Sequence, residues 1–220
     1  MKPRWVHFAL SAVLALMIVG TARADISGSA WVVTDITAQN AIPGNVPGTP
    51  ANLTFTVPTL INFDSRLGGD NNINPNYAIG DWLATGGATN IVYSGGLTSA
   101  TLLDVGGNGM IFDFTGMVTV VNGQTFTVTH DDGLTLNIGA LNVINLPGPH
   151  APITDTLTYT GPSGNLPFEL VYGECCGAPA VLQIDLPLVN APEPSSAGLL
   201  GVMLLGFAPL AVVFRRKWFS

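Results

Sequence analysis

Hydrophobic and polar residues alternate in short runs along most of the chain, as they do in strands that bury one face. Two such runs, 125–129 and 134–138, flank a four-residue turn from His130 to Gly133. No stretch shows the 3.6-residue period with capping residues that is typical of a helix. The 26 glycines and 16 prolines are scattered without a repeat, which fits many strands joined by turns. The pattern therefore predicts an all-β domain, an antiparallel and jelly-roll-like β-sandwich.

The alternation also predicts one clear hairpin. It joins 118–121 to 124–128 through Asn122 and Gly123, a pair suited to the two positive φ values of a type I′ turn. The predicted strands of the domain are 30–33, 52–57, 90–93, 101–103, 110–114, 118–121, 124–128, 134–138, 141–144, 156–159, 168–172 and 180–186.

The turn at 130–133 holds two adjacent carboxylates, Asp131 and Asp132, which is more than a tight turn requires. Neighbouring side chains on a strand point to opposite faces, so both acids can aim at one point only where the backbone bends. A hard cation such as calcium prefers oxygen ligands of this kind. The alternative is an ordinary solvated Asp-Asp-Gly turn, and these residues taken alone favour it.

A second, weaker calcium candidate lies earlier in the chain. Asp70, Asn72, Asn74 and Asp81 fall at positions one, three, five and twelve of a calcium-loop template. Position six is Pro75, where the template needs glycine for a sharp turn, and no flanking helix is predicted. The alternative is an asparagine-rich surface loop.

The basic residues of the chain are concentrated at its ends. Between residues 25 and 191 Arg66 is the only basic residue, against thirteen acids, so this span has a net charge of −12. Such a body would be repelled by phosphate backbones, and we expect no nucleic acid partner. It would attract cations, although acidity that merely keeps a protein soluble would have the same composition.

Catalytic signatures are missing from the sequence of the body. His130 and His150 have no cysteine or further acidic partner at zinc-ligand spacing, so we expect both to be surface residues. No nucleophile stands in an elbow or triad context, and adjacent carboxylates do not flank a glycosidic bond from two sides. We therefore expect a protein that is not an enzyme.

The first 24 residues have the pattern of a secretory signal peptide. Lys2 and Arg4 precede an apolar run from residue 5 to 19, and a small-x-small cleavage pattern ends at Ala24, before Asp25. Export through a secretion translocon follows, with a domain at 25–190.

The last thirty residues, 191–220, have the pattern of a membrane segment. Residues 197–214 carry no charge and as a helix would span about 27 Å, enough to cross a bilayer core. The basic residues at 215–217, which include Arg215 and Arg216, place this end in the cytoplasm and the body outside.

Pro192, Glu193 and Pro194 stand directly before that segment. The triplet, the apolar span and the basic end together resemble the PEP-CTERM sorting signal of exported bacterial proteins. The resemblance implies that an exosortase-type membrane protease cuts near the triplet. The protein would be anchored transiently in the inner membrane and then released to the cell envelope surface or the extracellular matrix.

Residues 111–186 resemble the protective-antigen-type sugar-binding β-sandwich and its GLEYA adhesin relatives. The resemblance is carried by residues 114–116, by 126–139 with Asp131-Asp132-Gly133, and by 167–174 before a closing apolar strand. In the lectin members, the matching aspartates are joined by a cis peptide and hold a calcium ion that binds sugar hydroxyls. The resemblance implies that Asp131 and Asp132 do the same.

These inferences favour an extracellular adhesion or carbohydrate-binding protein that binds exopolysaccharide through calcium. The competing hypothesis is a structural envelope or matrix protein with a sandwich that holds no small ligand. Binding to glycans that is lost with a chelator would distinguish the first from the second.

Cys175 and Cys176 are the only cysteines and they are adjacent. In an exported chain we expect them to form a vicinal disulfide, although intermolecular bridges and free thiols remain alternatives. Intact mass with and without reductant should show a monomer lighter by two hydrogens before reduction. Masses of disulfide-linked dimers would contradict this.

Overall fold

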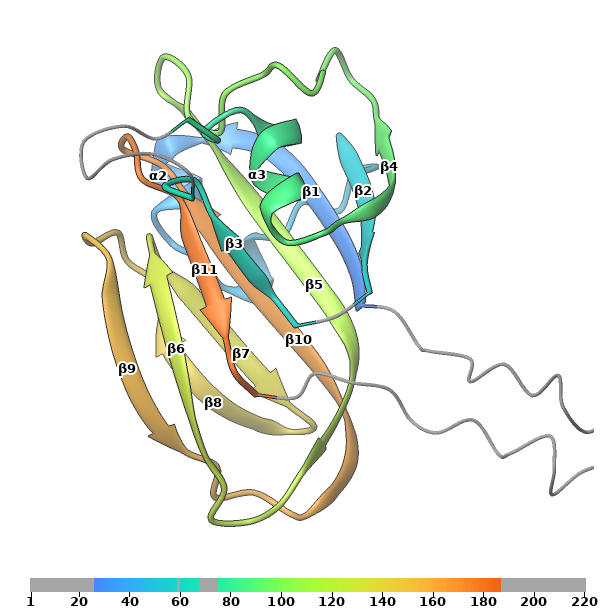
Figure 1. Ribbon diagram of the computed structural model, residues 1–220, viewed down its shortest axis with the longest axis vertical. Coiled ribbons are helices and arrows are strands. Elements are labelled where there is room, and N and C mark those ends of the chain that lie inside the picture. Colours follow the sequence, from blue (N-terminus) through green and yellow to red (C-terminus); the bar gives the residue numbers. More distant parts are fainter. Residues whose placement is uncertain (1–25, 59, 68–74, 187–220) are drawn as a thin grey trace, which may run out of the picture. The chain divides into compact units, whose positions relative to one another are not determined.

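A computed structural model describes residues 26–58, 60–67 and 75–186 of the chain. Two antiparallel sheets lie face to face, with the smaller in front of the larger in Figure 1. The larger has the strand order β4-β2-β1-β5-β10-β7-β8 and the smaller the order β3-β11-β6-β9. The strands are β1 (Ile26–Thr34), β2 (Leu53–Val57), β3 (Asn62–Asp64), β4 (Thr89–Tyr93), β5 (Asn108–Val120), β6 (Thr125–Asp131), β7 (Leu134–Ile138), β8 (Leu141–Leu146), β9 (Ile153–Thr158), β10 (Gly164–Glu174) and β11 (Val181–Ile184). The prediction of an all-β sandwich is confirmed.

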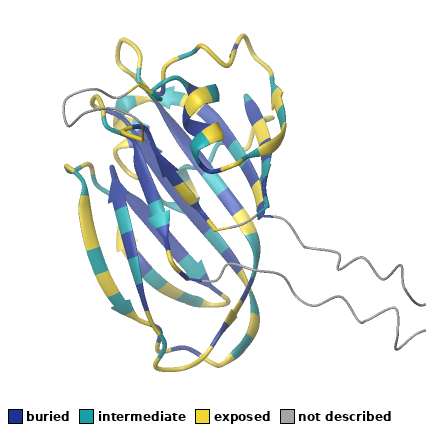
Figure 2. Cartoon of the chain, in the orientation of Figure 1, coloured by how far each residue is buried: buried dark blue, intermediate teal, exposed yellow. Residues whose placement is uncertain are grey.

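The two sheets share one hydrophobic core, to which the inward faces of both contribute (Figure 2). Aromatic rings form its centre: the centroids of Phe63 and Trp82 are 4.5 Å apart, and those of Trp82 and Tyr172 are 6.0 Å apart. All three side chains are fully buried. Full burial of an aromatic side chain stabilises a fold by about 2–3 kcal/mol, so this cluster fixes how the sheets pack.

The expectation of no helix was wrong at two short segments. The helix α2 (Asp35–Ala38) has one turn, and α3 (Ile79–Thr85) has two, while η1 (Pro43–Asn45) is a 3₁₀ turn. A segment of four or seven residues is too short for a 3.6-residue period to stand out. The amphipathic α3 nevertheless brings Trp82 into the core. Among the residues that the structure describes, no helix is long and apolar enough to span a membrane.

The predicted hairpin at Asn122 and Gly123 was also wrong. The strands on either side, β5 and β6, belong to different sheets and do not pair. Only Gly123 has a positive φ, of 84°, whereas a type I′ turn needs two. The Asn122 side chain instead donates to the carbonyl oxygens of Thr160 and Gly161, at 2.9 Å each. These bonds tie the β5–β6 connection, which crosses from one sheet to the other, to the loop that precedes β10.

Two strand boundaries differ from the prediction as well. The run 110–114 and residues 118–120 of the next run belong to one continuous strand, β5, which ends before Val121. The run 101–103 is not a strand, since Leu102 makes only an isolated bridge to Ala78. Polar and small residues inside a long strand look like a break, and apolar residues inside a loop look like a strand. Tertiary contacts decide the structure at both places, and the local pattern does not report them.

A second crossover, from β6 to β7, passes through Asp132 and Gly133. The chain is packed tightly there, because a Cβ atom built on Gly133 would lie 2.1 Å from the carbonyl oxygen of Pro147. The backbone N–H of Gly173 donates to the Gly133 carbonyl at 3.0 Å, which ties the crossover to β10.

We predict that Gly133→Ala destabilises the protein by about 1–3 kcal/mol, the usual cost of overpacking. Gly148→Ala is the matched control, because no atom lies within 4 Å of a Cβ atom at that position. Urea unfolding of the two variants checks this. Equal unfolding midpoints would show that the crossover can relax to admit a methyl group.

Candidate functional site

The two predicted acids lie at the end of β6, where the chain leaves the smaller sheet. Asp131 and Asp132 are each only 4% exposed, so the alternative of a solvated turn was wrong. The peptide bond between them is cis. The sequence identified the pair, but only the structure shows that both carboxylates are buried.

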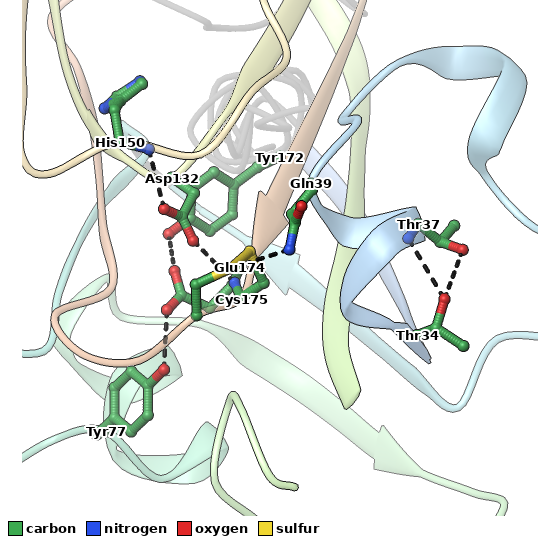
Figure 3. The surroundings of a disulfide bond; sticks show 10 residues. Thr34, Thr37, Gln39, Tyr77, Asp132, His150, Tyr172, Glu174 and Cys175 are labelled. Carbon is green, nitrogen blue, oxygen red and sulfur yellow. Dashed lines mark hydrogen bonds between the residues drawn. A yellow bond between two sulfur atoms is a disulfide. The ribbon is translucent and has the colours of Figure 1, made fainter. Parts of the chain in front are cut away.

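Backbone N–H groups from two loops hold the Asp132 carboxylate (Figure 3). Cys175 N donates to Oδ2 at 2.9 Å and His150 N donates to Oδ1 at 3.2 Å. Burial raises the pKa of Asp132, and these two hydrogen bonds oppose the rise because they favour the ionised form. Asp132 is therefore the better-stabilised anion of the pair.

Asp131 has the opposite electrostatic environment. Burial, and after it the negative charge of Asp132, raise the pKa of Asp131 from 3.8 to about 7. The interaction between the two neighbouring acids thus adds to the effect of burial. Near neutral pH, the pair holds a proton that two exposed aspartates would have released.

No basic side chain neutralises this pair within the described part of the chain. Arg66, the only arginine or lysine there, forms a two-pronged ion pair with Asp64, with Nε to Oδ1 at 2.9 Å and Nη2 to Oδ2 at 2.8 Å. These hydrogen bonds raise the pKa of Arg66. Its charge also lowers the pKa of Asp131, although this effect is smaller than those that raise it.

A buried hydrogen-bond chain lies behind the pair and was missed in the sequence. Tyr77 Oη donates to Glu174 Oε1 at 3.0 Å, and Tyr172 Oη lies 2.5 Å from Glu174 Oε2 (Figure 3). Tyr172 Oη also bonds to the Asp131 carbonyl oxygen. The single Tyr172 proton cannot serve two acceptors, so both bonds form when Glu174 is protonated and donates to Tyr172. Burial raises the pKa of Glu174 well above its usual value, in agreement with this assignment.

A signal for this chain was present in the alternation of β10. Tyr172 and Glu174 are two residues apart, so they project to the same face of the strand. An acid that shares a strand face with a buried tyrosine is itself buried and needs a hydrogen-bond partner. That partner, Tyr77, is 97 residues away in the sequence, so the local pattern could not predict it.

A hollow of about 300 Å³ opens beside the two carboxylates. Its walls come from the link before β9 and from the turn after β10, where Cys175 and Cys176 form a disulfide. Ligand atoms of Asp132 and the two cysteines lie within 4.8 Å of one another. Disulfide sulfurs are poor ligands for a hard cation, so the carboxylate oxygens are the donors that matter here. The lining residues are Asp131, Asp132, Pro149, His150, Ala151, Pro152, Cys175, Cys176, Gly177, Ala178 and Pro179.

Asp81, the described member of the second calcium candidate, does not line this hollow. Asp81 is exposed in the first turn of α3, so a helix does follow the second calcium candidate, contrary to expectation. The remaining members of that candidate, the signal-peptide cleavage site and the sorting motif lie outside the described residues; they are Asp70, Asn72, Asn74, Ala24, Asp25, Pro192, Glu193, Pro194, Arg215 and Arg216. The predicted membrane segment 197–214 lies outside them as well.

The expectation for the histidines was half wrong. His130 is fully buried, with Nδ1 2.7 Å from the carbonyl oxygen of Asp132, whereas His150 is partly exposed. The alternation of β6 indicated that His130 is buried, because His130 shares a strand face with the buried Phe126 and Val128.

Comparison with known proteins gives only distant similarity. No family model matches the chain, and neither does any curated protein. Similar solved structures include a PA14 sugar-binding domain from an RTX adhesin, with 18% identity over 74% of this chain and 88% of that chain and a TM-score of 0.43. The PA14 domain of the MpAFP antifreeze protein has 17% identity over 77% of this chain and 83% of that chain, with a TM-score of 0.42. Likeness at this level carries no argument about what the chain binds.

We predict that the chain loses stability as pH rises from about 4 to about 7 in the presence of a chelator. The folded pKa of Asp131 is raised to about 7, so its stabilising contribution is complete below the unfolded pKa of 3.8 and is lost as pH rises through 7. Asp131→Asn should make the decline shallower. Burial also raises the pKa of Asp113, to about 6, so part of the decline should remain in the variant.

Urea unfolding at each pH measures this free energy of unfolding. A wild-type profile that rises over the same interval, or a variant with the wild-type slope, would contradict the assignment of the proton to the acid pair.

Proposed function

We propose that this protein is an extracellular carbohydrate-binding or adhesion protein whose Asp131–Asp132 pair holds a calcium ion. The observation that carries the proposal is a pair of adjacent buried carboxylates that line a hollow, with no arginine or lysine among the described residues of that lining. Two adjacent carboxylates favour a divalent cation over a proton once the cation is available.

The residues of the chain have separate roles in this proposal. Asp131 and Asp132 supply oxygen ligands, and the N–H groups of Cys175 and His150 hold the Asp132 carboxylate in place. Tyr172, which bonds to the Asp131 carbonyl, fixes the backbone from behind. A bound calcium ion supplies coordination positions that sugar hydroxyls can occupy.

The hollow is suited to a neutral ligand. Apart from its two acids and a histidine, its walls are proline, alanine, glycine and the disulfide, and they carry no basic side chain for a phosphate or sulfate. At about 300 Å³ it has the size of the smallest ligand pockets, enough for one sugar unit rather than a long chain. Binding, and not catalysis, is the activity we propose.

The proposed partner is exopolysaccharide of the cell surface or extracellular matrix. The signal-peptide and sorting-signal patterns support export and handling by an exosortase, and these segments lie outside the described residues. The alternative remains a structural matrix protein with no small ligand. The lack of a tryptophan, tyrosine or phenylalanine among the residues that line the hollow favours this alternative, because aromatic rings provide much of the contact area at binding sites.

We predict that calorimetry with the full-length chain in detergent detects one calcium site. The double variant Asp131→Asn with Asp132→Asn should lose this binding, because it removes both charged ligands. Asp81→Asn should bind as the wild type does, since Asp81 is exposed in α3 and away from the hollow. Loss of binding in Asp81→Asn alone would instead assign calcium to the second candidate.

A glycan array probed with calcium, and again with chelator, then tests the carbohydrate. Signals that disappear with the chelator and in the double variant support the proposed function. No heat of calcium binding in a folded wild type would overturn the metal site, and a silent array with calcium bound would favour the structural alternative.

A further inference from the structure

A second cluster of metal-ligating side chains lies on the other face of β6. His130 and Asp131 are neighbours on the strand, so His130 points between the sheets while Asp131 points away from them. The pairing of His130 with Ile153 places Asp155, two residues further along β9, on the same inner face. His150 lies in the link that leads into β9, and its ring centroid is 4.4 Å from that of His130.

Three buried polar atoms of this cluster lack a hydrogen-bond partner. Among the described residues, six buried side-chain nitrogen or oxygen atoms have none, and three of the six are His130 Nε2, His150 Nε2 and Asp155 Oδ2. Buried polar atoms without partners are uncommon in folded proteins, and one explanation for such an atom is a bound ion. Two of these atoms, His130 Nε2 and Asp155 Oδ2, lie 3.5 Å apart, and the third belongs to the neighbouring His150 ring.

The protonation of both rings follows from their hydrogen bonds. His130 Nδ1 lies 2.7 Å from the Asp132 carbonyl oxygen, and His150 Nδ1 lies 2.8 Å from the Ala151 carbonyl oxygen. A carbonyl oxygen only accepts, so each Nδ1 carries a hydrogen and each neutral ring has its lone pair on Nε2. Metal-ligating histidines have this arrangement, in which the second ring nitrogen donates to a backbone carbonyl.

The distance between His130 Nε2 and Asp155 Oδ2 is the distance expected between two ligands of one metal ion. His130 Nε2 and Asp155 Oδ2 are 3.5 Å apart, an ion-pair distance if the ring were protonated. In the neutral ring with its hydrogen on Nδ1, the lone pair of Nε2 faces the carboxylate. Ligands at 2.0–2.2 Å from a tetrahedral zinc ion lie about 3.4 Å from one another, close to the distance seen here.

We propose that His130, His150 and Asp155 form a binding site for zinc or a similar transition-metal ion. His130 Nε2 and Asp155 Oδ2 supply two ligands in their present positions. The ligand atoms of all three side chains do not lie within 4.8 Å of one another, so His150 supplies the third only when its partly exposed ring turns and its Nδ1 leaves the Ala151 carbonyl oxygen. Solvent takes the fourth position. Imidazole ligands suit zinc, copper and nickel, whereas the carboxylate pair at Asp131 and Asp132 suits calcium, so the two sites differ in the cation they prefer.

The proposal does not depend on the calcium site or on carbohydrate binding. It uses the inner face of β6 and different donor atoms. A bound metal ion would connect the edge strand β9, and the loop that precedes it, to β6 beside the hollow.

Calorimetry with Zn²⁺, on the full-length, untagged chain after chelator treatment and dialysis, tests this proposal, with Co²⁺ as a visible-absorption probe of tetrahedral coordination. We expect one site in the wild type and at least about tenfold weaker binding in His150→Ala and in Asp155→Asn, since each loses a ligand. These positions are partly exposed, so both variants should fold, whereas substitution of the buried His130 risks unfolding.

The chain offers two matched controls. Asp185→Asn removes an exposed acid that bonds to Thr127 on the smaller sheet, and His7→Ala removes the only other histidine of the sequence. Neither should change zinc affinity. Excess Ca²⁺ should not displace Co²⁺ from the site.

Two results would overturn the proposal. One is a folded wild type that binds no Zn²⁺. The other is zinc binding that His150→Ala and Asp155→Asn leave unchanged and that Asp131→Asn with Asp132→Asn abolishes, which would place the cation on the acid pair. Failure of calcium to bind in the separate calcium titration has no bearing on either result.

Discussion

The passage of the chain from one sheet to the other at the end of β6 is the constraint on which the site depends. Within two residues, Asp132 and Gly133, the backbone must leave the smaller sheet and join the larger one. Only a glycine fits against Pro147 at this point. A backbone hydrogen bond to β10 holds the crossover, and backbone N–H groups from two loops hold the Asp132 carboxylate, at a place where both acids are buried.

Burial of like charges makes this region electrostatically unusual. Two ionised carboxylates repel each other more strongly in a low-dielectric environment than in water, so they need a proton or a cation. Burial keeps a proton on Glu174, which is enclosed by two tyrosines, whereas Asp131 and Asp132 face a hollow that solvent and ions can reach. This difference in solvent access distinguishes Glu174, a structural acid, from the acid pair, whose carboxylates are candidate metal ligands.

Much of the architecture was predictable from local pattern, and its connections were not. Alternation located most strands because it reports which face of a strand is buried, and it does so with few residues. The sheet that each strand joins depends on distant partners, which is why Asn122-Gly123 gave a false hairpin. The acid pair was found because its two residues are adjacent in sequence. Tyr77 and Asp155, which reach their partners only through the folded chain, were not found.

The ion pair of Arg66 with Asp64 has a consequence for the proteolysis of this protein. Proteases that cut after lysine or arginine find one such bond between residues 25 and 191, because Arg66 is the only basic residue there. Its guanidinium is already bound by both oxygens of Asp64, and a protease pocket would have to remove it from that carboxylate. The composition that makes the body acidic therefore also makes it a poor substrate for trypsin-like enzymes.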